Sequence, residues 1–223
     1  MMDHSIPVIA IDGPTASGKG TIAGRVAREL GYNYLDSGAI YRVLAVAALA
    51  HGLFPESESD LRKLDALAAS LPVEFRADRI YLGGKDVTES IRSEEAGTMA
   101  SRLAVIPSLR GHLLQRQRDF RRGSGLVADG RDMGSVVFPD AALKVFLTAS
   151  AQTRAERRHR QLIERGESAD LAVILADLQA RDKRDTERAV APLKPCEGAH
   201  VLDCSDMSID EVVNTVKAWY LKA

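Results

Sequence analysis

The sequence predicts an α/β fold, with a five-stranded parallel sheet and helices on both of its faces. Short apolar runs that end in acidic or small residues alternate with helical patterns along the chain. The first run is uninterrupted, which is typical of a strand buried on both faces. At 223 residues the chain can form one sizeable core with an insertion. Ligand groups are therefore expected at the carboxyl ends of the strands.

The first strand is expected at residues 8–11, and an amphipathic helix follows with apolar side chains at Ile22, Val26 and Leu30. The loop between them has the spacing that binds phosphates through backbone N–H groups, the helix N-terminus and Lys19. It predicts a nucleoside triphosphate site, and the alternative is an accidental glycine-rich turn. The loop residues are Gly13, Pro14, Thr15, Ala16, Ser17, Gly18, Lys19, Gly20 and Thr21.

The residue after Lys19 is unusual for such a loop. Ser or Thr normally stands there and supplies a hydroxyl to magnesium, whereas this chain has Gly20 and places the hydroxyl at Thr21. Mg²⁺ gives up its water reluctantly. We therefore expect no direct protein ligand, and a Mg²⁺ ion held through waters and substrate phosphates near Asp129.

Four more strands are expected at residues 32–36, 126–129, 144–148 and 200–203. The final helix begins with a capping box formed by Ser208 and Glu211. The section from residue 55 to 95 differs, because a stripe of leucines leads into Pro72 and then into two alternating apolar runs. This pattern predicts a helix and antiparallel strands, inserted within about residues 37–95. The insertion either covers a substrate or is decorative.

Charged residues follow two of the predicted strands. The second strand leads into Ser37, Tyr41 and Arg42, and the third ends at Asp129 and leads into Arg131 and Asp132. Groups at these strand ends favour a ligand site, because several buried charges are costly without a partner. A surface arginine and residues that cap the next helix are the alternatives.

Two later helices carry arginines on one face. In a helix from Ser168 past Asp185, an apolar stripe continues into Arg181, Asp185 and Arg188, which favours a polar cleft over a solvated helix end. Within about residues 150–168, Arg154 and Arg158 lie one turn apart. They predict a short arginine-rich lid, and a solvated basic helix is the alternative.

The composition excludes several classes of protein. The chain has 30 basic and 31 acidic side chains and a net charge of −1, so no general attraction to nucleic acid or to a membrane is expected. Cys196 and Cys204 form neither a C-x-x-C pair nor a zinc pattern. The longest apolar run, residues 43–50, is too short to span a bilayer, and no basic leader precedes it. We expect a cytoplasmic protein.

An ordered set of motifs resembles the bacterial-type cytidylate kinases, which belong to the nucleoside monophosphate kinase group of P-loop kinases. The motifs are the loop ending in Gly-Lys-Gly-Thr, the block from Asp36 to Arg42, the block from Asp129 to Gly134, and the block from Arg188 to Leu193. The match extends nearly from end to end. It implies a single kinase domain over residues 1–223, with an inserted monophosphate-binding subdomain at about 37–95.

The resemblance implies that the γ-phosphoryl group of ATP is transferred to CMP or dCMP, with Mg²⁺ required, by a monomer. It assigns phosphate binding and catalysis to Lys19, Arg131, Arg154, Arg158 and Arg188. Arg42 would bind the monophosphate, and Arg181 and Asp185 would contact the ribose. Cytosine offers an amino donor beside two acceptors, so Arg110 is expected to donate to the acceptors while Ser101 or Asp132 accepts from the amine. The lid and the insertion would close when both substrates are bound.

Two other functions remain open at this point. The first is a related kinase for small molecules, such as an adenylate or a uridylate-cytidylate kinase, which would differ mainly in the base pocket. The second is a nucleotide sensor or a GTPase-like switch that catalyses no transfer. The GTPase version is disfavoured because the chain has no N-K-x-D guanine-binding motif.

Overall fold

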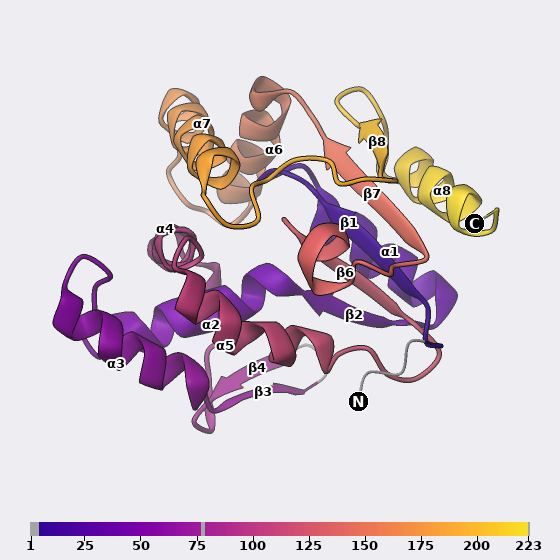
Figure 1. Ribbon diagram of the computed structural model, residues 1–223. Helices are drawn as coiled ribbons and strands as arrows, with labels where there is room; N and C mark the ends of the chain where they lie inside the picture. Colours follow the sequence, from indigo (N-terminus) through magenta and orange to yellow (C-terminus); the bar gives the residue numbers. More distant parts are fainter. Residues whose placement is uncertain (1–4, 77–78, 223) are drawn as a thin grey trace. The chain divides into compact units, whose positions relative to one another are not determined.

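The computed structural model describes residues 5–76 and 79–222. Its main sheet has the strand order β2-β6-β1-β7-β8, and the paired strands β1, β6, β7 and β8 are parallel (Figure 1). The predicted α/β fold class is confirmed, and each of the five predicted strands is present. These are β1 (Val8–Asp12), β2 (Asn33–Asp36), β6 (Leu126–Gly130), β7 (Leu143–Thr148) and β8 (His200–Asp203).

The centre of the sheet is buried on both faces. Strand β1 lies between β6 and β7, and all five of its residues are buried. Ile9 and Ile11 belong to a core cluster with apolar side chains of α1 (Lys19–Leu30) and α8 (Ile209–Tyr220). The alternate residues of β1 point to the opposite face, where the π-helical turn η2 (Met133–Val137) lies.

The chain divides into two compact units. Within the described residues, the first unit comprises residues 5–35 and 118–222 and contains most of the main sheet. It also contains α6 (Ala151–Glu164) and α7 (Leu171–Glu187), which pack against each other. Helix α7 begins after Asp170, whose side chain accepts hydrogen bonds from the N–H groups of Ala172 and Val173.

The second unit is Asp36–Gln117. It contains an antiparallel sheet of β3 (Val73–Arg76), β4 (Arg79–Leu82) and β5 (Lys85–Asp86), so the expected helix and antiparallel strands are present. Gly83 and Gly84 both have positive φ angles and reverse the chain between β4 and β5. The helical elements are α2 (Ser37–Ala50), α3 (Glu58–Ala69), η1 (Ser90–Arg92), α4 (Glu94–Leu103) and α5 (Pro107–Arg118).

This second unit extends further along the chain than the 37–95 expected for the insertion. Helix α4 packs against α2, and Leu109 and Leu113 of α5 are fully buried. Helix α4 and nearly all of α5 therefore belong to the same compact unit as α2 and α3.

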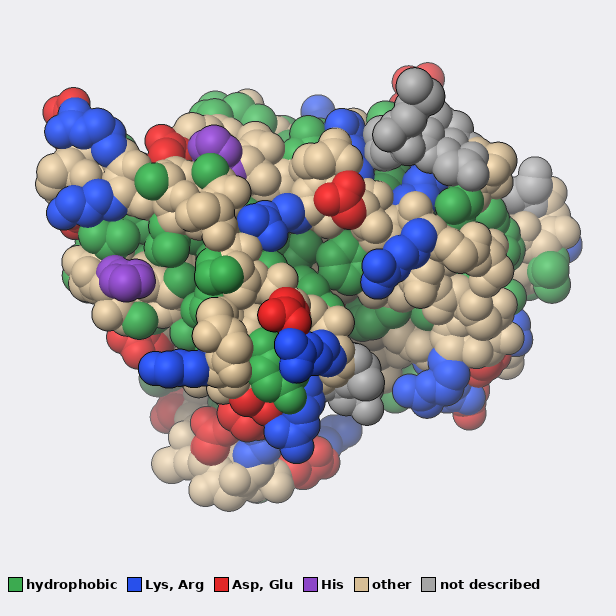
Figure 2. Space-filling view, turned by 90° about the horizontal axis from the view of Figure 1, so that it is seen from below, with side chains coloured by type: hydrophobic (Ala, Val, Ile, Leu, Met, Phe, Trp, Pro, Cys, Tyr) green, Lys and Arg blue, Asp and Glu red, His purple; other side chains and the backbone are tan. Residues whose placement is uncertain are grey.

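Local signals at the helix ends agree with the sequence. The capping box of Ser208 and Glu211 is present at the start of α8. Asp36 caps α2 by accepting from the N–H of Ala39. Among the described residues, no helix is both long enough and apolar enough to cross a membrane. Basic and acidic side chains are interspersed on the face shown in Figure 2.

Candidate functional site

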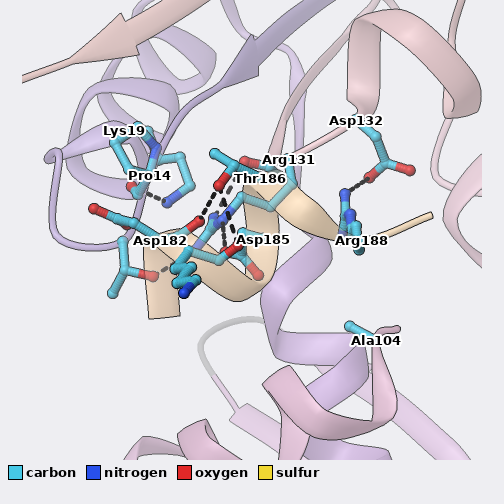
Figure 3. A network of polar contacts seen from close by, with 12 residues as sticks. Pro14, Lys19, Ala104, Arg131, Asp132, Asp182, Asp185, Thr186 and Arg188 are labelled. Atoms are coloured by element: carbon cyan, nitrogen blue, oxygen red, sulfur yellow. Dashed lines mark hydrogen bonds and ion pairs between the residues drawn. The ribbon is translucent and has the colours of Figure 1, made fainter. Parts of the chain in front are cut away.

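The glycine-rich loop joins β1 to α1 in the first unit. At Gly13 a Cβ atom would lie 2.0 Å from the carbonyl oxygen of Leu147, so only glycine fits there. Gly18 has a φ of 89° and precedes the first residue of α1, Lys19. The Lys19 Nζ donates to the carbonyl oxygen of Pro14 across the loop, at 3.2 Å (Figure 3). The loop therefore presents a helix N-terminus and an ammonium group on the same segment.

A pocket of about 670 Å³ adjoins this loop. The loop side of the pocket runs from Ala16 to Ile22, and α6 contributes Arg157 and Arg160. The remaining lining residues are Gln161, Glu164, Cys204, Met207, Ser208, Ile209 and Val212. Cys204 is buried, and both cysteines are free thiols. A volume of this size is in the range of small-molecule sites.

Asp129 lies beside Gly20. The Tyr34 hydroxyl donates to Asp129 Oδ1 at 2.9 Å, and a Cβ atom on Gly20 would lie 3.8 Å from Asp129 Oδ2. Thr21 is exposed in the first turn of α1. Mg²⁺ in nucleotide sites is commonly bound through one or two carboxylates with waters and phosphates, and one buried carboxylate next to the loop fits that pattern.

Asp12 is a buried carboxylate at the end of β1. Its Oδ1 accepts from the N–H of Met133 at 2.8 Å, and its Oδ2 accepts from the N–H of Gly134 at 2.9 Å. Burial raises the pKa of Asp12 to about 6, although these two hydrogen bonds act in the opposite direction. No local sequence pattern predicts this contact, since the partners lie far apart along the chain.

Arg131 forms the centre of a buried polar network. Its Nε donates to Asp185 Oδ2 at 2.9 Å, and its Nη2 donates to the Thr15 hydroxyl at 2.6 Å. Figure 3 shows the Arg131 and Asp185 side chains directed at each other. Burial raises the pKa of Asp185, but the charges of Arg131, Arg181 and Arg188 outweigh it and lower the pKa overall. Asp185 is therefore ionised at neutral pH.

Arg188 lies close to Asp132, as Figure 3 also shows. Its Nη2 is 3.9 Å from Asp132 Oδ1, and its Nε donates to the carbonyl oxygen of Ala191. The backbone of the same segment returns to α7, because the N–H of Leu193 donates to the Asp185 carbonyl at 2.8 Å. Arg131, Asp132, Asp185 and Arg188 thus lie in one connected group of the first unit.

Arg154 is buried and donates hydrogen bonds to three acceptors. It donates to the carbonyl oxygens of Ala149 at 3.0 Å and Thr15 at 3.1 Å, and to Asp182 Oδ2 at 2.6 Å. Arg158 is half-buried and lies 3.5 Å from Gln161 Oε1. Neither of these expected lid residues lines the pocket beside the loop, whereas Arg157 and Arg160 do.

The second unit holds the other sequence-predicted residues. The Ser37 hydroxyl donates to Gln117 Oε1 at 2.7 Å, and Tyr41 is buried. Arg42 Nη1 donates to the carbonyl oxygen of Ile91 at 2.9 Å. Ser101 and Arg110 are also buried, and Arg110 Nη1 donates to the carbonyl oxygen of Ala104 at 3.3 Å.

Sequence comparison identifies close relatives over almost the whole chain. The family model for cytidylate kinase matches residues 9–221. A cytidylate kinase from Polynucleobacter asymbioticus is 54% identical over 219 residues, covering 98% of each chain. One from Bordetella pertussis is 56% identical over 210 residues, covering 94% of this chain and 93% of that protein. One from Pseudomonas aeruginosa is 53% identical over 221 residues, covering 96% and 95%. This chain belongs to the cytidylate kinase family.

Proposed function

We propose that this protein transfers the γ-phosphoryl group of ATP to CMP or dCMP, which gives ADP and CDP or dCDP. The observation that carries the proposal is the buried network of Arg131, Asp132, Asp185 and Arg188, in the same unit as the glycine-rich loop. A loop alone would suit any nucleotide triphosphate enzyme. The network adds two arginines, Arg131 and Arg188, which supply positive charge for the phosphate of a second substrate.

ATP is the phosphoryl donor, and we assign its phosphates to the loop from Gly13 to Thr21. Backbone N–H groups at the start of α1 and the Lys19 ammonium are the donors. The pocket beside the loop has space for the rest of the nucleotide. Mg²⁺ would neutralise phosphate charge there, held near Asp129 through water.

The acceptor phosphate is assigned to Arg131 and Arg188, together with Arg42 of the second unit. Guanidinium groups match phosphate oxygens in two-point hydrogen bonds, which suits them to this task. Asp185 and Arg181 are assigned to the ribose. Asp185 also holds the Arg131 guanidinium, so one carboxylate would orient a phosphate-binding group and contact the sugar.

Base recognition is assigned to Arg110, Ser101 and Asp132, with Ser37 and Tyr41 in supporting contacts. Cytosine N3 and O2 accept hydrogen bonds, and its amino group donates one. A buried arginine can supply the two donors, and a hydroxyl or carboxylate can accept from the amine. Uracil reverses the pattern at two of these positions, which would favour CMP over UMP.

The transfer step needs positioning and charge neutralisation. An oxygen of the monophosphate forms the new bond to the γ-phosphorus while the bond from that phosphorus to the β,γ-bridging oxygen breaks, and ADP leaves. The attacking oxygen is already anionic at neutral pH, so no strong base is required. Lys19, Arg131 and Arg188, with Arg154 and Arg158, would stabilise the charge that spreads over the moving group.

Several broader expectations accompany this assignment. Residues of about 37–95 would bind the monophosphate, and residues of about 150–168 would act as a lid that excludes water. The protein would act as a cytoplasmic monomer on CMP and dCMP, without nucleic acid or membrane. The two free thiols support a reducing compartment, and the balanced charge supports action without nucleic acid or membrane.

A coupled assay of ADP release tests the function. With ATP and Mg²⁺, CMP and dCMP should support fast release, UMP and AMP should support much slower release, and water alone should give the slowest rate. Preference for AMP or UMP would replace the assignment by a related kinase. ATP binding without turnover on any monophosphate would indicate a sensor.

A further inference from the structure

Asp12 occupies a position that the proposed transfer does not itself explain. It is the last residue of β1, directly before Gly13, and the residue is only 6% exposed. Burial of a carboxylate is costly unless hydrogen bonds compensate it. Both of its oxygens accept from backbone N–H groups of a segment more than 120 residues later in the chain. The hydrogen bonds that offset the cost of burying Asp12 therefore come from one segment of the chain.

That segment begins a helical turn with no cap of its own. Met133 and Gly134 are the first residues of η2, and the preceding Asp132 makes no side-chain cap hydrogen bond. The first N–H groups of a helical turn lack partners within it and need external acceptors. Asp12 supplies two acceptors from a neighbouring strand, so it takes the part that a capping residue normally has.

Side chains pack closely against both glycines of this segment. A Cβ atom on Gly130 would lie 2.7 Å from Met133 Cε, and one on Gly134 would lie 3.0 Å from Cys196 Sγ. The carbonyl oxygen of Asp132 accepts from the N–H of Val136 at 2.9 Å. Asp12 thus holds the start of a tight turn that Arg131 and Asp132 directly precede.

We propose that Asp12 is a positioning residue that fixes the backbone of the Arg131–Gly134 segment to the end of β1. The carboxylate thereby holds the Arg131 guanidinium and the Asp132 carboxylate in register with the glycine-rich loop, which starts one residue after Asp12. The inference rests on the proposed function for its effect on CMP, but its structural part stands on the two hydrogen bonds alone.

Asp12→Asn tests the proposal, with Asp140→Asn as the matched control. Asparagine keeps one acceptor oxygen and turns an amide donor toward the second N–H, so one hydrogen bond is lost. Asp140 lies in the same unit and pairs with the buried Arg121 at 2.8 Å, so its substitution likewise removes a carboxylate charge and weakens a contact of that carboxylate, but one remote from Met133 and Gly134. Loss of a hydrogen bond to a charged group predicts that kcat/KM for CMP falls about 10- to 100-fold in Asp12→Asn, while the KM for ATP stays unchanged.

Amide hydrogen exchange, followed by NMR, supplies a readout that does not depend on activity. Met133 and Gly134 should be protected in the wild type, and the amide that loses its acceptor should exchange faster in Asp12→Asn, whereas neither should exchange faster in Asp140→Asn. If Asp12→Asn does not fold, two other measurements test the proposal. They are the protection of the Met133 and Gly134 amides in the wild type and the exchange rates of the same amides in Asp12→Glu.

Unprotected Met133 and Gly134 amides in the wild type would overturn the proposal. So would equal losses of kcat/KM in Asp12→Asn and the control. A wild type inactive on CMP would instead overturn the proposed function, while the exchange comparison would still test Asp12.

Discussion

The two units use charged side chains differently. In the first unit, Arg131 with Asp185 and Arg154 with Asp182 are buried or nearly so, and each arginine also donates to Thr15 of the glycine-rich loop. In the second unit, the ion pairs on the small sheet are open to solvent, with the Arg79 side chain 68% exposed. Burying an ion pair requires removing water from both charges, which costs free energy. An exposed ion pair has little effect on stability in either direction. The ion pairs that are costly to bury are those beside the loop.

Of the substitutions that test this contrast, Lys19→Ala is expected to have the largest effect on activity. It removes the ammonium that spans the loop, and loss of one transition-state donor predicts a fall in kcat of about 10²- to 10³-fold. Steady-state kinetics with varied ATP and CMP would measure it. A variant with weaker ATP binding and normal turnover would contradict the transition-state role.

Asp185→Asn removes a negative charge from the buried network. Arg131 would lose its ionised partner, and breaking a buried pair typically costs about 3–5 kcal/mol of stability. We expect a lower free energy of unfolding in urea and a lower kcat/KM for CMP. An unchanged kcat/KM would show that Arg131 needs no carboxylate to act.

The pH dependence of stability tests the burial of Asp12. Its pKa of about 6 in the folded protein exceeds its ordinary value of 3.8, so folding favours the protonated form. Its contribution to stability is therefore greatest below about pH 4 and is lost as the pH rises through 6, by on the order of 3 kcal/mol.

This loss appears as a difference between wild type and Asp12→Asn. As the pH rises from 4 to 6, the free energy of unfolding of the wild type should fall relative to that of the variant. Parallel pH profiles would mean that the Asp12 pKa is not raised.

Arg110→Met probes the second unit. Removal of a buried guanidinium that reads the base should raise the KM for CMP about 10- to 100-fold, the value of a hydrogen bond to a charged group. The ratio of CMP to UMP activity should fall, while the KM for ATP stays constant. An unchanged KM for CMP would withdraw the base-reading role.

Arg79→Ala should have the smallest effect. Arg79 pairs with Asp86 across two exposed strands, and water screens such a pair. Thermal unfolding and kcat/KM should match the wild type. A clear loss of activity would mean that exposed charges of the second unit also act in catalysis.

The sequence predicts the fold and the loop because their signals are local. Short apolar runs give the strands, and the spacing of Gly13, Gly18 and Lys19 gives the loop. Helical spacing also predicts that Asp185 and Arg188 lie near each other. The structure ends α7 at Glu187, so Arg188 lies just beyond the helix, yet both residues belong to one network with Arg131 and Asp132.

Other features depend on contacts that no local pattern reveals. Asp12 needs the register of β1 against β6 before it can meet Met133. Arg157 and Arg160, rather than Arg154 and Arg158, line the pocket because the rotation of α6 is set by its packing on α7. The arginine run alone cannot distinguish these pairs.

A crystal structure with bound CMP tests the central assignment most directly. We expect the phosphate oxygens to lie within hydrogen-bond distance of the Arg131 and Arg188 guanidinium groups. A phosphate bound elsewhere, with no contact to Arg131 or Arg188, would contradict it.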